Sequence, residues 1–533
     1  MAKKLSEKRK KWIERTIAND RSYKVFLYNR FFFFLLSVLA QVVGYCIVWW
    51  LLVYDSAAAI VLQTIVFALE IIFLLHLINK YDRVSTKLSW IILILIAPVF
   101  GVPMYLVNGR GRPTRKMNKK IKKSKADLEK IGLDLLDKTC LPLDDRGDGV
   151  SYYLANTAKY PAFSDGKVTY YPSGEEMFPA MKEALLKAEK FIFLEYFIIA
   201  HGKMWNEILK ILLEKAEAGV KIRIIYDDFG CMMTLPPRYE QYLEGLHENI
   251  KCMTFNTVVP FFAVRMNNRD HRKILIVDGK VAFTGGINLA DEYIAEKRRF
   301  GYWKDTGVRI TGGAVNSFTY MFVYFWNAFR KDKEAIEEYW VKPTGAEALQ
   351  RTGVRIQPYD DSPLDGISTG EATYANVIQC AKRYVYVFTP YLVLDDHLRM
   401  LLAQAALRGV DVRIVTPGIP DKKMTYRLTR ANYEPLLKAG VKIYEYTPGF
   451  IHAKSMVCDD ECAIVGTINL DYRSLYFHFE NAVYFSGCEA VADVKRDAEE
   501  TFAVSKLCTE KNVKRGLIGR LVDAVLRVFE TLI

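Results

Sequence analysis

Paired cysteines are missing from this chain. Its nine cysteines include no CxxC pair, and their number is odd. The closest two, Cys458 and Cys462, have no histidines nearby in the order that a zinc site needs. A disulfide framework and a structural zinc site are therefore disfavoured, and we expect reduced thiols that pack inside a cytoplasmic domain.

Acidic residues are also in short supply. Lysine and arginine number 74 against 61 aspartate and glutamate residues, which gives a formal net charge of +13 in 533 residues. This excess of positive charge suggests an anionic partner, and both nucleic acid and an acidic lipid surface fit it. The length allows two or three domains, each with a core of its own.

Charge is nearly absent from three stretches close to the N-terminus. Residues 31–54 and 88–107 carry none, and residues 57–78 carry one carboxylate, Glu70. About twenty apolar residues cross a bilayer, so residues 31–54 and 57–78 predict transmembrane helices rather than a cleaved signal peptide. We expect Glu70 to face protein or water, and a contact between subunits of a homo-oligomer is the simplest reason.

The flanks of these stretches predict their orientation. Residues 1–30, 80–87 and 110–125 are all basic, and the positive-inside rule assigns all three to the cytoplasm. Three full spans cannot place them there, whereas two can. We therefore predict a multi-pass membrane domain over 31–108 in the plasma membrane, whose third, proline-interrupted stretch re-enters the inner leaflet. The globular region is then cytoplasmic; the alternative is three spans and an external globular region.

Two segments flank the globular region. Residues 109–145 form a basic linker, and residues 507–533 carry apolar side chains at helical spacing with basic residues between them. A basic amphipathic helix in an anchored protein indicates an element that lies at the membrane interface. A helix packed on the globular core is the alternative.

The globular region contains a repeated pattern. Residues 188–226 and 381–416 each read as a strand, an amphipathic helix and a β-rich strand, and a second related segment follows each unit. Strands that alternate with helices at this spacing predict an α/β fold around a largely parallel sheet. We therefore expect two homologous α/β/α halves, residues 146–345 and 346–506, packed as one pseudo-symmetric body.

Each half contains His-x-Lys, four further residues, Asp, and then Gly-[Gly/Thr]-x-Asn. His271 and Lys273, like His452 and Lys454, stand two apart on a predicted strand, so both side chains of a pair point to one face. An imidazole beside an ammonium group suits an anion, and in particular a phosphodiester. Two such pairs that face each other predict a reaction centre.

The other motif positions have more than one interpretation. Gly286 permits close approach of the backbone to a substrate, and Asn288 and Asn469 are expected to donate hydrogen bonds to phosphate oxygens. Asp278 and Asp459 complete the catalytic motifs, but they stand at turns several residues from the histidines, so a structural role is an equal alternative.

The motifs predict a two-step phosphoryl transfer. One histidine attacks phosphorus and forms a covalent phospho-imidazole, while the other protonates the leaving oxygen and later activates the incoming alcohol. The two lysines and the two asparagines stabilise the charge on the phosphoryl oxygens. The scheme requires neither a metal ion nor another cofactor.

A nucleophilic histidine needs an acceptor at its second nitrogen. The strands that follow the two asparagines align Asp305 with Glu480. We expect these carboxylates to orient the two imidazoles and to stabilise their cationic forms.

A few more charged or polar residues are candidates for substrate contact. Glu195 stands on the first strand of its unit without a counterpart in the other half, so a structural charge is an equal alternative. Arg473 and Ser474 follow the second motif and either contact a lipid head group or begin a helix. Asp227 and Asp228 end a strand, where ligands gather in parallel sheets, but a metal pair there is disfavoured.

The double HxKxxxxD pattern resembles the phospholipase D superfamily over nearly all of residues 146–506. Residues 302–312 and 444–475, and the segment APVFGVPMYLVNG that follows the hydrophobic pair, are similar to bacterial cardiolipin synthases. That resemblance implies transfer of a phosphatidyl group between two phosphatidylglycerol molecules, with release of glycerol. It also implies that His271 is the nucleophile and His452 the acid/base. Thr467 stands where the first half has Gly286, a departure that removes no reacting group.

Three other functions compete with this interpretation. Another phosphatidyltransferase or a lipid hydrolase would differ only in the alcohol that accepts the intermediate. A nuclease would use the same histidines, but membrane anchors and an amphipathic tail argue for phosphatidylglycerol and anionic membrane lipid as partners and against nucleic acid. A membrane scaffold that binds lipid without catalysis is the third.

Overall fold

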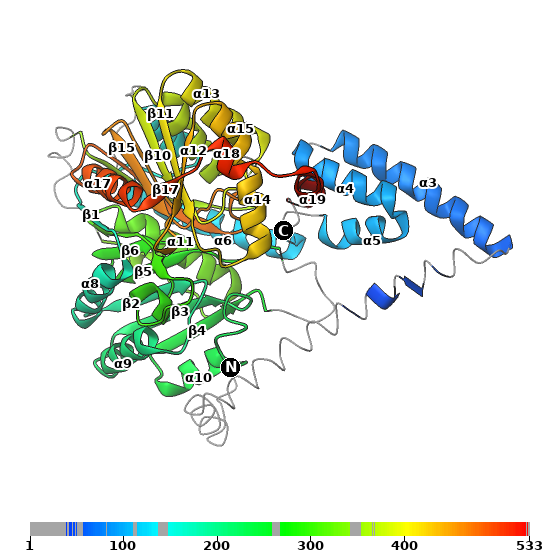
Figure 1. Cartoon of the computed structure of the whole chain (residues 1–533). Coiled ribbons are helices and arrows are strands. Elements are labelled where there is room, and N and C mark those ends of the chain that lie inside the picture. The colour runs from blue at the N-terminus through cyan, green and yellow to red at the C-terminus, as the bar shows by residue number, and fades with distance from the viewer. Residues whose placement is uncertain are drawn as a thin grey trace.

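The computed structural model describes residues 57–80, 83–109, 114–136, 148–257, 267–341, 353–364, 366, 368–528 and 530, and scattered positions between 39 and 50. The basic segment 1–30 and most of the predicted span 31–54 lie outside the described residues. Figure 1 shows the two α/β halves, green and yellow to orange, with the N-terminal helices in blue beside them.

The first half is built on a mixed sheet. Only the pairs β2–β3 and β3–β4 run parallel, and the remaining neighbours are antiparallel. Among the described residues this sheet has seven strands, in the order β1 (Val168–Tyr171), β8 (Gly307–Thr311), β6 (Val281–Gly285), β5 (Lys273–Val277), β2 (Phe191–Tyr196), β3 (Lys221–Asp227) and β4 (Ile250–Phe255).

The second half repeats this arrangement, with parallel pairing confined to β10–β11 and β11–β12. The prediction of two homologous α/β halves is confirmed, but the prediction of a largely parallel sheet is wrong, because the motif strands return as antiparallel hairpins. The eight strands described here are ordered β17 (Ser505–Leu507), β12 (Lys442–Tyr446), β11 (Asp411–Pro417), β10 (Tyr384–Phe388), β14 (Ser455–Cys458), β15 (Cys462–Gly466), β16 (Glu480–Ser486) and β9 (Arg355–Asp361).

Helices cover the sheets where the sequence predicts amphipathic segments. Gly219 and Gly409 turn the chain from a helix into the next strand with φ of 92° and 90°, a conformation that favours glycine. The helices of the globular region are α6 (Arg115–Leu136), α7 (Gly149–Asn156), α8 (Gly174–Leu186), α9 (Lys203–Glu217), α10 (Tyr239–Leu246), α11 (Val315–Phe329), α12 (Thr369–Cys380), α13 (Asp396–Leu407), α14 (Lys423–Ala431), α15 (Tyr433–Lys438), α16 (Tyr472–Tyr476), α17 (Ala490–Ala503) and α18 (Glu510–Val513), with short 3-10 turns at Asp291–Ile294 and Ile336–Glu338.

The two halves share one hydrophobic core. It joins Ile276 of β5 and Phe322 of α11 to Tyr359 of β9 and Val483 of β16, all fully or almost fully buried. A second core fills the space between the other face of the first sheet and helices α8 and α9. Since burial of apolar surface is the main stabilising term in folding, the halves are expected to unfold together.

The segment predicted as a basic linker contains a packed helix. Helix α6 buries Ile121 and Leu128, and its Ser124 hydroxyl donates to the Tyr324 carbonyl of α11 at 2.7 Å. Its lysines remain mostly exposed on the opposite side. The apolar side of this amphipathic helix therefore packs on the globular region.

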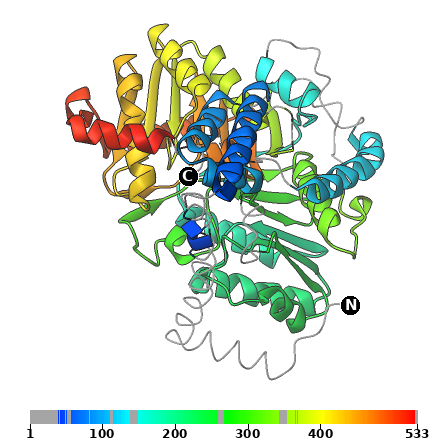
Figure 2. The same cartoon turned by 90° about the vertical axis from the view of Figure 1, so that its right-hand side faces the viewer.

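The N-terminal helices form a small unit of their own. Helices α3 (Ala57–Asn79), α4 (Val84–Ile96) and α5 (Pro98–Asn108) enclose a core that includes Trp90 and Tyr105. Pro98 separates α4 from α5, and a Cβ on Gly101 would lie 2.6 Å from the Ile94 Cα, so these two helices fold back on each other. Figure 2 shows the unit in blue on the side facing the viewer.

The predicted transmembrane helices are not confirmed. Within the described part of the chain, no helix is both long enough and apolar enough to cross a membrane.

The C-terminal helix α19 (Leu517–Val528) packs on the body along one side only. Asp523 pairs with Arg427 of α14 at 2.7 Å, and Leu526 packs against Leu428 and Tyr472. The other side is exposed, including Leu517, Ile518, Leu521 and Val525. Helix α19 is thus docked on the globular region and still presents an apolar face, and its position at a membrane interface stays a prediction.

Candidate active site

The two motif histidines are each held by the other half of the molecule. The His271 N–H donates to the Phe479 carbonyl at 2.8 Å, and the His452 N–H donates to the Lys304 carbonyl at 2.7 Å. Their side chains are largely buried. Both histidines therefore lie at the junction where the edge segments of the two halves run side by side.

The carboxylates cross between the halves in the same way. Nδ1 of His271 lies 2.8 Å from Oε2 of Glu480, and Nδ1 of His452 lies 2.6 Å from Oδ2 of Asp305. Both carboxylates are fully buried. Because the carboxyl group holds Nδ1 in each pair, Nε2 of each imidazole is left for chemistry. Neither half contains a complete histidine–carboxylate pair, and the sequence comparison of the halves did not reveal this exchange.

The two motifs differ at one position, and there each half accommodates its neighbouring carboxylate differently. A Cβ on Gly286 would lie 1.9 Å from Oδ1 of Asp305, so the glycine makes room for that carboxylate. In the second half the Thr467 hydroxyl occupies the equivalent place and donates to Oε2 of Glu480 at 2.5 Å. Gly286 thus lies against Asp305, and its predicted contact with substrate stays a prediction.

Each motif lysine contacts the backbone of the histidine two residues before it. Nζ of Lys273 donates to the His271 carbonyl at 2.6 Å, and Nζ of Lys454 donates to the His452 carbonyl. Burial lowers the pKa of Lys273 to about 8 and that of Lys454 to about 7. An anionic substrate would favour the cationic form of both amines.

Both imidazoles are neutral at neutral pH. Burial and then the charge of Lys273 hold the pKa of His271 well below its ordinary value. Burial and Lys454 lower the pKa of His452 to about 4, against the opposing effect of Asp305. A neutral imidazole is the form that attacks phosphorus, so the free site is prepared for nucleophilic catalysis.

The two asparagines are not equivalent. Asn288 accepts from the Ile198 N–H at 3.0 Å and donates to the Tyr293 hydroxyl at 2.7 Å, so its amide braces the loop. Asn469 is buried, and its Oδ1 accepts no hydrogen bond from the described residues. Of the two, Asn469 keeps more capacity for a ligand.

The motif aspartates lie at the far end of their strands. Asp278 accepts from the N–H groups of Lys190 and Phe191 at 2.8 Å each, and Asp459 binds the start of β10 in the same way. Asp278 stands five positions after Lys273, roughly 16 Å along an extended strand. These contacts favour a structural role for both aspartates.

The structure also places the other residues that the sequence suggested for substrate contact. Glu195 is fully buried and pairs with Arg272 at 2.5 Å, so it belongs to an internal ion network. Ser474 is buried on α16, and burial raises the pKa of the Glu480 carboxyl group well above its usual range. Arg473 is partly exposed on α16. Asp227 is buried near Arg269, with a pKa that burial raises to about 7.

A third histidine, His478, was missed in the sequence. Its ring centroid lies 5.7 Å from that of His271, and its Nδ1 lies 3.7 Å from Oε1 of Glu480. The available signal was its position two residues before Glu480, which places it on the same face of the strand.

His271, His478 and Glu480 also form a group that could hold a metal ion, the one such group in the described part of the chain. One ligand atom from each of His271, His478 and Glu480 lies within 4.8 Å of the others. The surroundings disfavour a cation, however, because Lys273 is close and two of the three ligands already bind each other. The residues suit phosphate better than metal.

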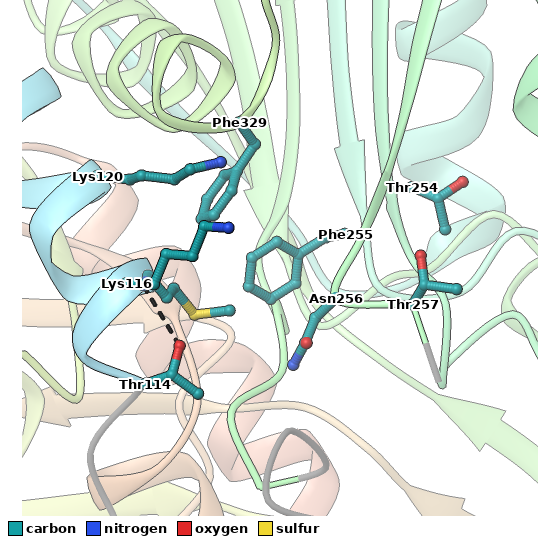
Figure 3. Close-up of a pocket in the computed structure, with 9 residues that line it drawn as sticks. Thr114, Lys116, Lys120, Thr254, Phe255, Asn256, Thr257 and Phe329 are labelled. Carbon is teal, nitrogen blue, oxygen red and sulfur yellow. Dashed lines mark hydrogen bonds between the residues drawn. The ribbon is translucent and has the colours of Figure 1, made fainter. Parts of the chain in front are cut away.

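A separate pocket of about 270 Å³ lies away from the histidines, between the start of α6, the end of β4 and the end of α11 (Figure 3). Lys116 and Lys120 stand at its edge, and Phe255 and Phe329 line it. The Asn256 carbonyl at this pocket accepts from Arg269, two residues before His271, at 2.8 Å. This hydrogen bond links the pocket to the segment that carries His271, and none of the motif residues lines the pocket.

Two family descriptions match this chain. The one described as "Cardiolipin synthase, PLD-like domain" matches residues 181–299 and 374–502, one stretch in each half. The one described as "Phospholipase D-nuclease N-terminal" matches residues 68–110, which include α4 and α5.

Full-length relatives show the same likeness. The chain is 31% identical to a cardiolipin synthase of Alkalihalophilus pseudofirmus, over 88% of this chain and 93% of that protein. It is 30% identical to a cardiolipin synthase of Geobacillus kaustophilus, over 89% and 94%. An uncharacterized protein of Streptococcus mutans is 42% identical over 86% and 99%.

A solved structure supports the fold. The phosphatidylserine synthase of Haemophilus influenzae matches with a TM-score of 0.54 at 13% identity, over 72% of this chain and 98% of that one. At this identity the likeness concerns the fold alone.

Proposed function

The chain belongs to the cardiolipin synthase family of the phospholipase D superfamily and is a phosphatidyltransferase, and we propose that it makes cardiolipin and glycerol from two molecules of phosphatidylglycerol. The observation that carries this proposal is the crossed arrangement of two histidine–carboxylate pairs between two buried lysines. That arrangement suits attack on a phosphodiester from one side and proton transfer on the other.

The first step forms a covalent intermediate. Nε2 of His271 attacks phosphorus, and the bond from phosphorus to the glycerol oxygen breaks. His452 gives its Nε2 proton to that oxygen, and neutral glycerol leaves. Asp305 stabilises the imidazolium form of His452, whose pKa in the free site is about 4 and rises when an anionic phosphodiester offsets the charge of Lys454.

In the second step His452 accepts a proton instead of donating one. His452, now neutral, takes the proton of an incoming hydroxyl group. The oxygen of that group attacks phosphorus, and the bond from phosphorus to Nε2 of His271 breaks. Lys273, Lys454 and Asn469 stabilise the charge on the phosphoryl oxygens in both steps. When the hydroxyl belongs to a second phosphatidylglycerol, the product is cardiolipin.

A membrane location is part of the proposal. Helix α3 exposes large apolar side chains such as Ile65, Phe67 and Ile72, and helix α19 exposes another set. Large exposed apolar patches mark interaction sites, and both substrates are lipids. We place the protein in the plasma membrane through its N-terminal helices, with the two halves on the cytoplasmic side.

The direct test is a reaction with phosphatidylglycerol alone. The protein in detergent, with a chelator present, should release glycerol and form cardiolipin in equal amounts by mass spectrometry. His271→Ala should abolish both products. Phosphatidic acid as the main product would instead establish a hydrolase, and an unreactive protein would contradict the proposal.

A further inference from the structure

One side of the active site is built by two short strands that run parallel. Asp270 and Phe479 form a parallel bridge, and the backbone hydrogen bonds on either side of it are 2.8 Å long. Side chains alternate between the faces of such a pair. The residues on the face opposite to Asp270 and Phe479 are Arg269, His271, His478 and Glu480.

The other side of the site is built in the same way. Strands β7 (Tyr302–Lys304) and β13 (Gly449–Ile451) pair in parallel, with Phe450 opposite Trp303. Asp305 and His452 follow two residues later on the same face. The two sides of the site are therefore equivalent in backbone and in their reacting groups.

The residues next to the reacting groups break this symmetry. Phe450 and Trp303 pack beside His452, with ring centroids 5.9 and 5.5 Å from it. At the equivalent positions beside His271 stand Arg269 and His478. One side of the site is thus aromatic, and the other is polar and cationic.

His478 has hydrogen-bonding capacity that the protein does not use. Its side chain is 11% exposed. Neither ring nitrogen has a hydrogen-bond partner among the described residues, and both are buried. Leaving a buried donor unsatisfied costs about 1–3 kcal/mol. A polar ligand beside His271 would remove that cost.

Apart from Glu480, whose Oε1 lies 3.7 Å from Nδ1, the charged groups that act most on this histidine are positive. Its backbone N–H donates to the Arg473 carbonyl at 2.9 Å, which fixes α16 beside it. After burial, the charges of Arg473, Arg269 and Lys273 are the next causes that hold the pKa of His478 well below its ordinary value. The imidazole is thus a neutral N–H donor within a cationic environment, which favours an anion over a metal ion or a neutral group.

We propose that His478 and Arg473 form a second anion subsite, which binds the phosphate that the accepting lipid carries. This inference rests on the proposed function. An accepting phosphatidylglycerol attacks through its glycerol hydroxyl and keeps its own phosphodiester, one glycerol bridge away from the reacting phosphorus. The motif lysines serve the reacting phosphate, so the second phosphate needs separate donors beside the reaction axis.

The subsite explains how a lipid alcohol competes with water and with released glycerol. Both competitors are neutral and gain nothing from Arg473 or from the cations near it. A charge-assisted hydrogen bond to the phosphate strengthens the binding of the anionic acceptor alone. Selection of the acceptor is then electrostatic as well as steric.

The test is a competition between two acceptors in one reaction. Phosphatidylglycerol micelles are mixed with 1-propanol, so that transfer gives either cardiolipin or phosphatidylpropanol, and both are measured by mass spectrometry. His478→Leu and Arg473→Gln should each lower the ratio of cardiolipin to phosphatidylpropanol about tenfold or more. His478→Gln and Arg473→Lys, which keep a donor, should recover part of the ratio.

Arg496→Gln is the matched control, because Arg496 lies on α17 with its side chain 66% exposed, and its ratio should equal that of the unaltered protein. An equal loss of both products in the His478 and Arg473 variants would overturn the inference, because the residues would then serve the reacting phosphate or the fold. An unaltered protein that forms no cardiolipin would contradict the proposed function instead.

Discussion

An imidazole that attacks phosphorus must present one nitrogen while the other is held, and here the holding group comes from the opposite half. His271 depends on Glu480, and His452 depends on Asp305. The local sequence predicted the histidines, the lysines and both carboxylates as candidates. It did not predict the exchange, because a contact between residues about 150–200 positions apart leaves no local pattern.

Gly286 offers a residue-scale test of this geometry. In Gly286→Ala the new methyl group would overlap Oδ1 of Asp305, which is fully buried and has little room to move. We expect transfer activity to fall by about 10²-fold or more, because small misplacements of catalytic groups have effects of this size. Initial rates of cardiolipin formation measure it.

Gly149→Ala is the matched control, since no atom lies within 4 Å of the added Cβ. Its activity should equal that of the unaltered protein. An active Gly286→Ala variant would show that Asp305 need not occupy its present position.

The pKa values of the two motif lysines predict how kcat/KM falls at alkaline pH. An amine is cationic below its pKa and loses its charge as the pH rises through that value. In the free enzyme, kcat/KM should therefore decline first near pH 7, with Lys454, and again near pH 8, with Lys273. The acid limb should lie well below the ordinary pKa of a histidine, where His271 becomes protonated and can no longer attack phosphorus.

The profile is measured as initial rate against pH at low substrate. Lys454→Arg removes the titration near pH 7 and should move the alkaline limb upward, whatever its effect on the rate. A profile that stays flat to pH 9.5 would contradict the assignment of these amines to phosphate binding.

At the scale of elements, a loop of the N-terminal unit contacts the second half. Arg83, between α3 and α4, contacts Asp395 at 2.7 Å and also pairs with Glu371. Its guanidinium lies 3.5 Å from the ring centroid of Tyr476 on α16. Because α16 also carries Arg473, this contact connects the N-terminal helices to the acceptor side of the site.

Removal of this contact should loosen the N-terminal unit. Arg83→Ala removes the guanidinium that pairs with two largely buried carboxylates, and we expect a loss of about 1–3 kcal/mol in the free energy of unfolding. Thermal unfolding in detergent measures it.

Arg399→Ala is the control, because Arg399 pairs with the exposed Asp396 within one helix. Such exposed pairs contribute about 0.2–1 kcal/mol. Equal effects of the two substitutions would mean that the Arg83 contact does not hold the unit in place.

At the scale of the whole molecule, the repeat predicts two halves but not how much they share. Helix α17 of the second half accepts from Tyr170 of β1 at 2.6 Å and pairs with Lys304 at the same distance, both through Asp497. One core spans both sheets. Periodicity and motif spacing identify each half, whereas the interface depends on shape and buried charge that arise only when both halves are folded.

The exposed apolar faces of α3 and α19 were predictable from the sequence only in part. Hydropathy in the sequence identified both segments as candidates for contact with a membrane. It could not tell that α19 also docks on α14 through Asp523, because an ion pair across 96 residues is invisible to a local pattern.

The most direct measurement is to trap the covalent intermediate. The protein is mixed with phosphatidylglycerol labelled in its phosphate, quenched in alkali, digested and analysed by mass spectrometry, with His452→Asn used to slow the second step. We predict that the label resides on the peptide that contains His271 and disappears in His271→Ala. Label on His452 instead, or active protein that never carries label, would contradict the two-step transfer.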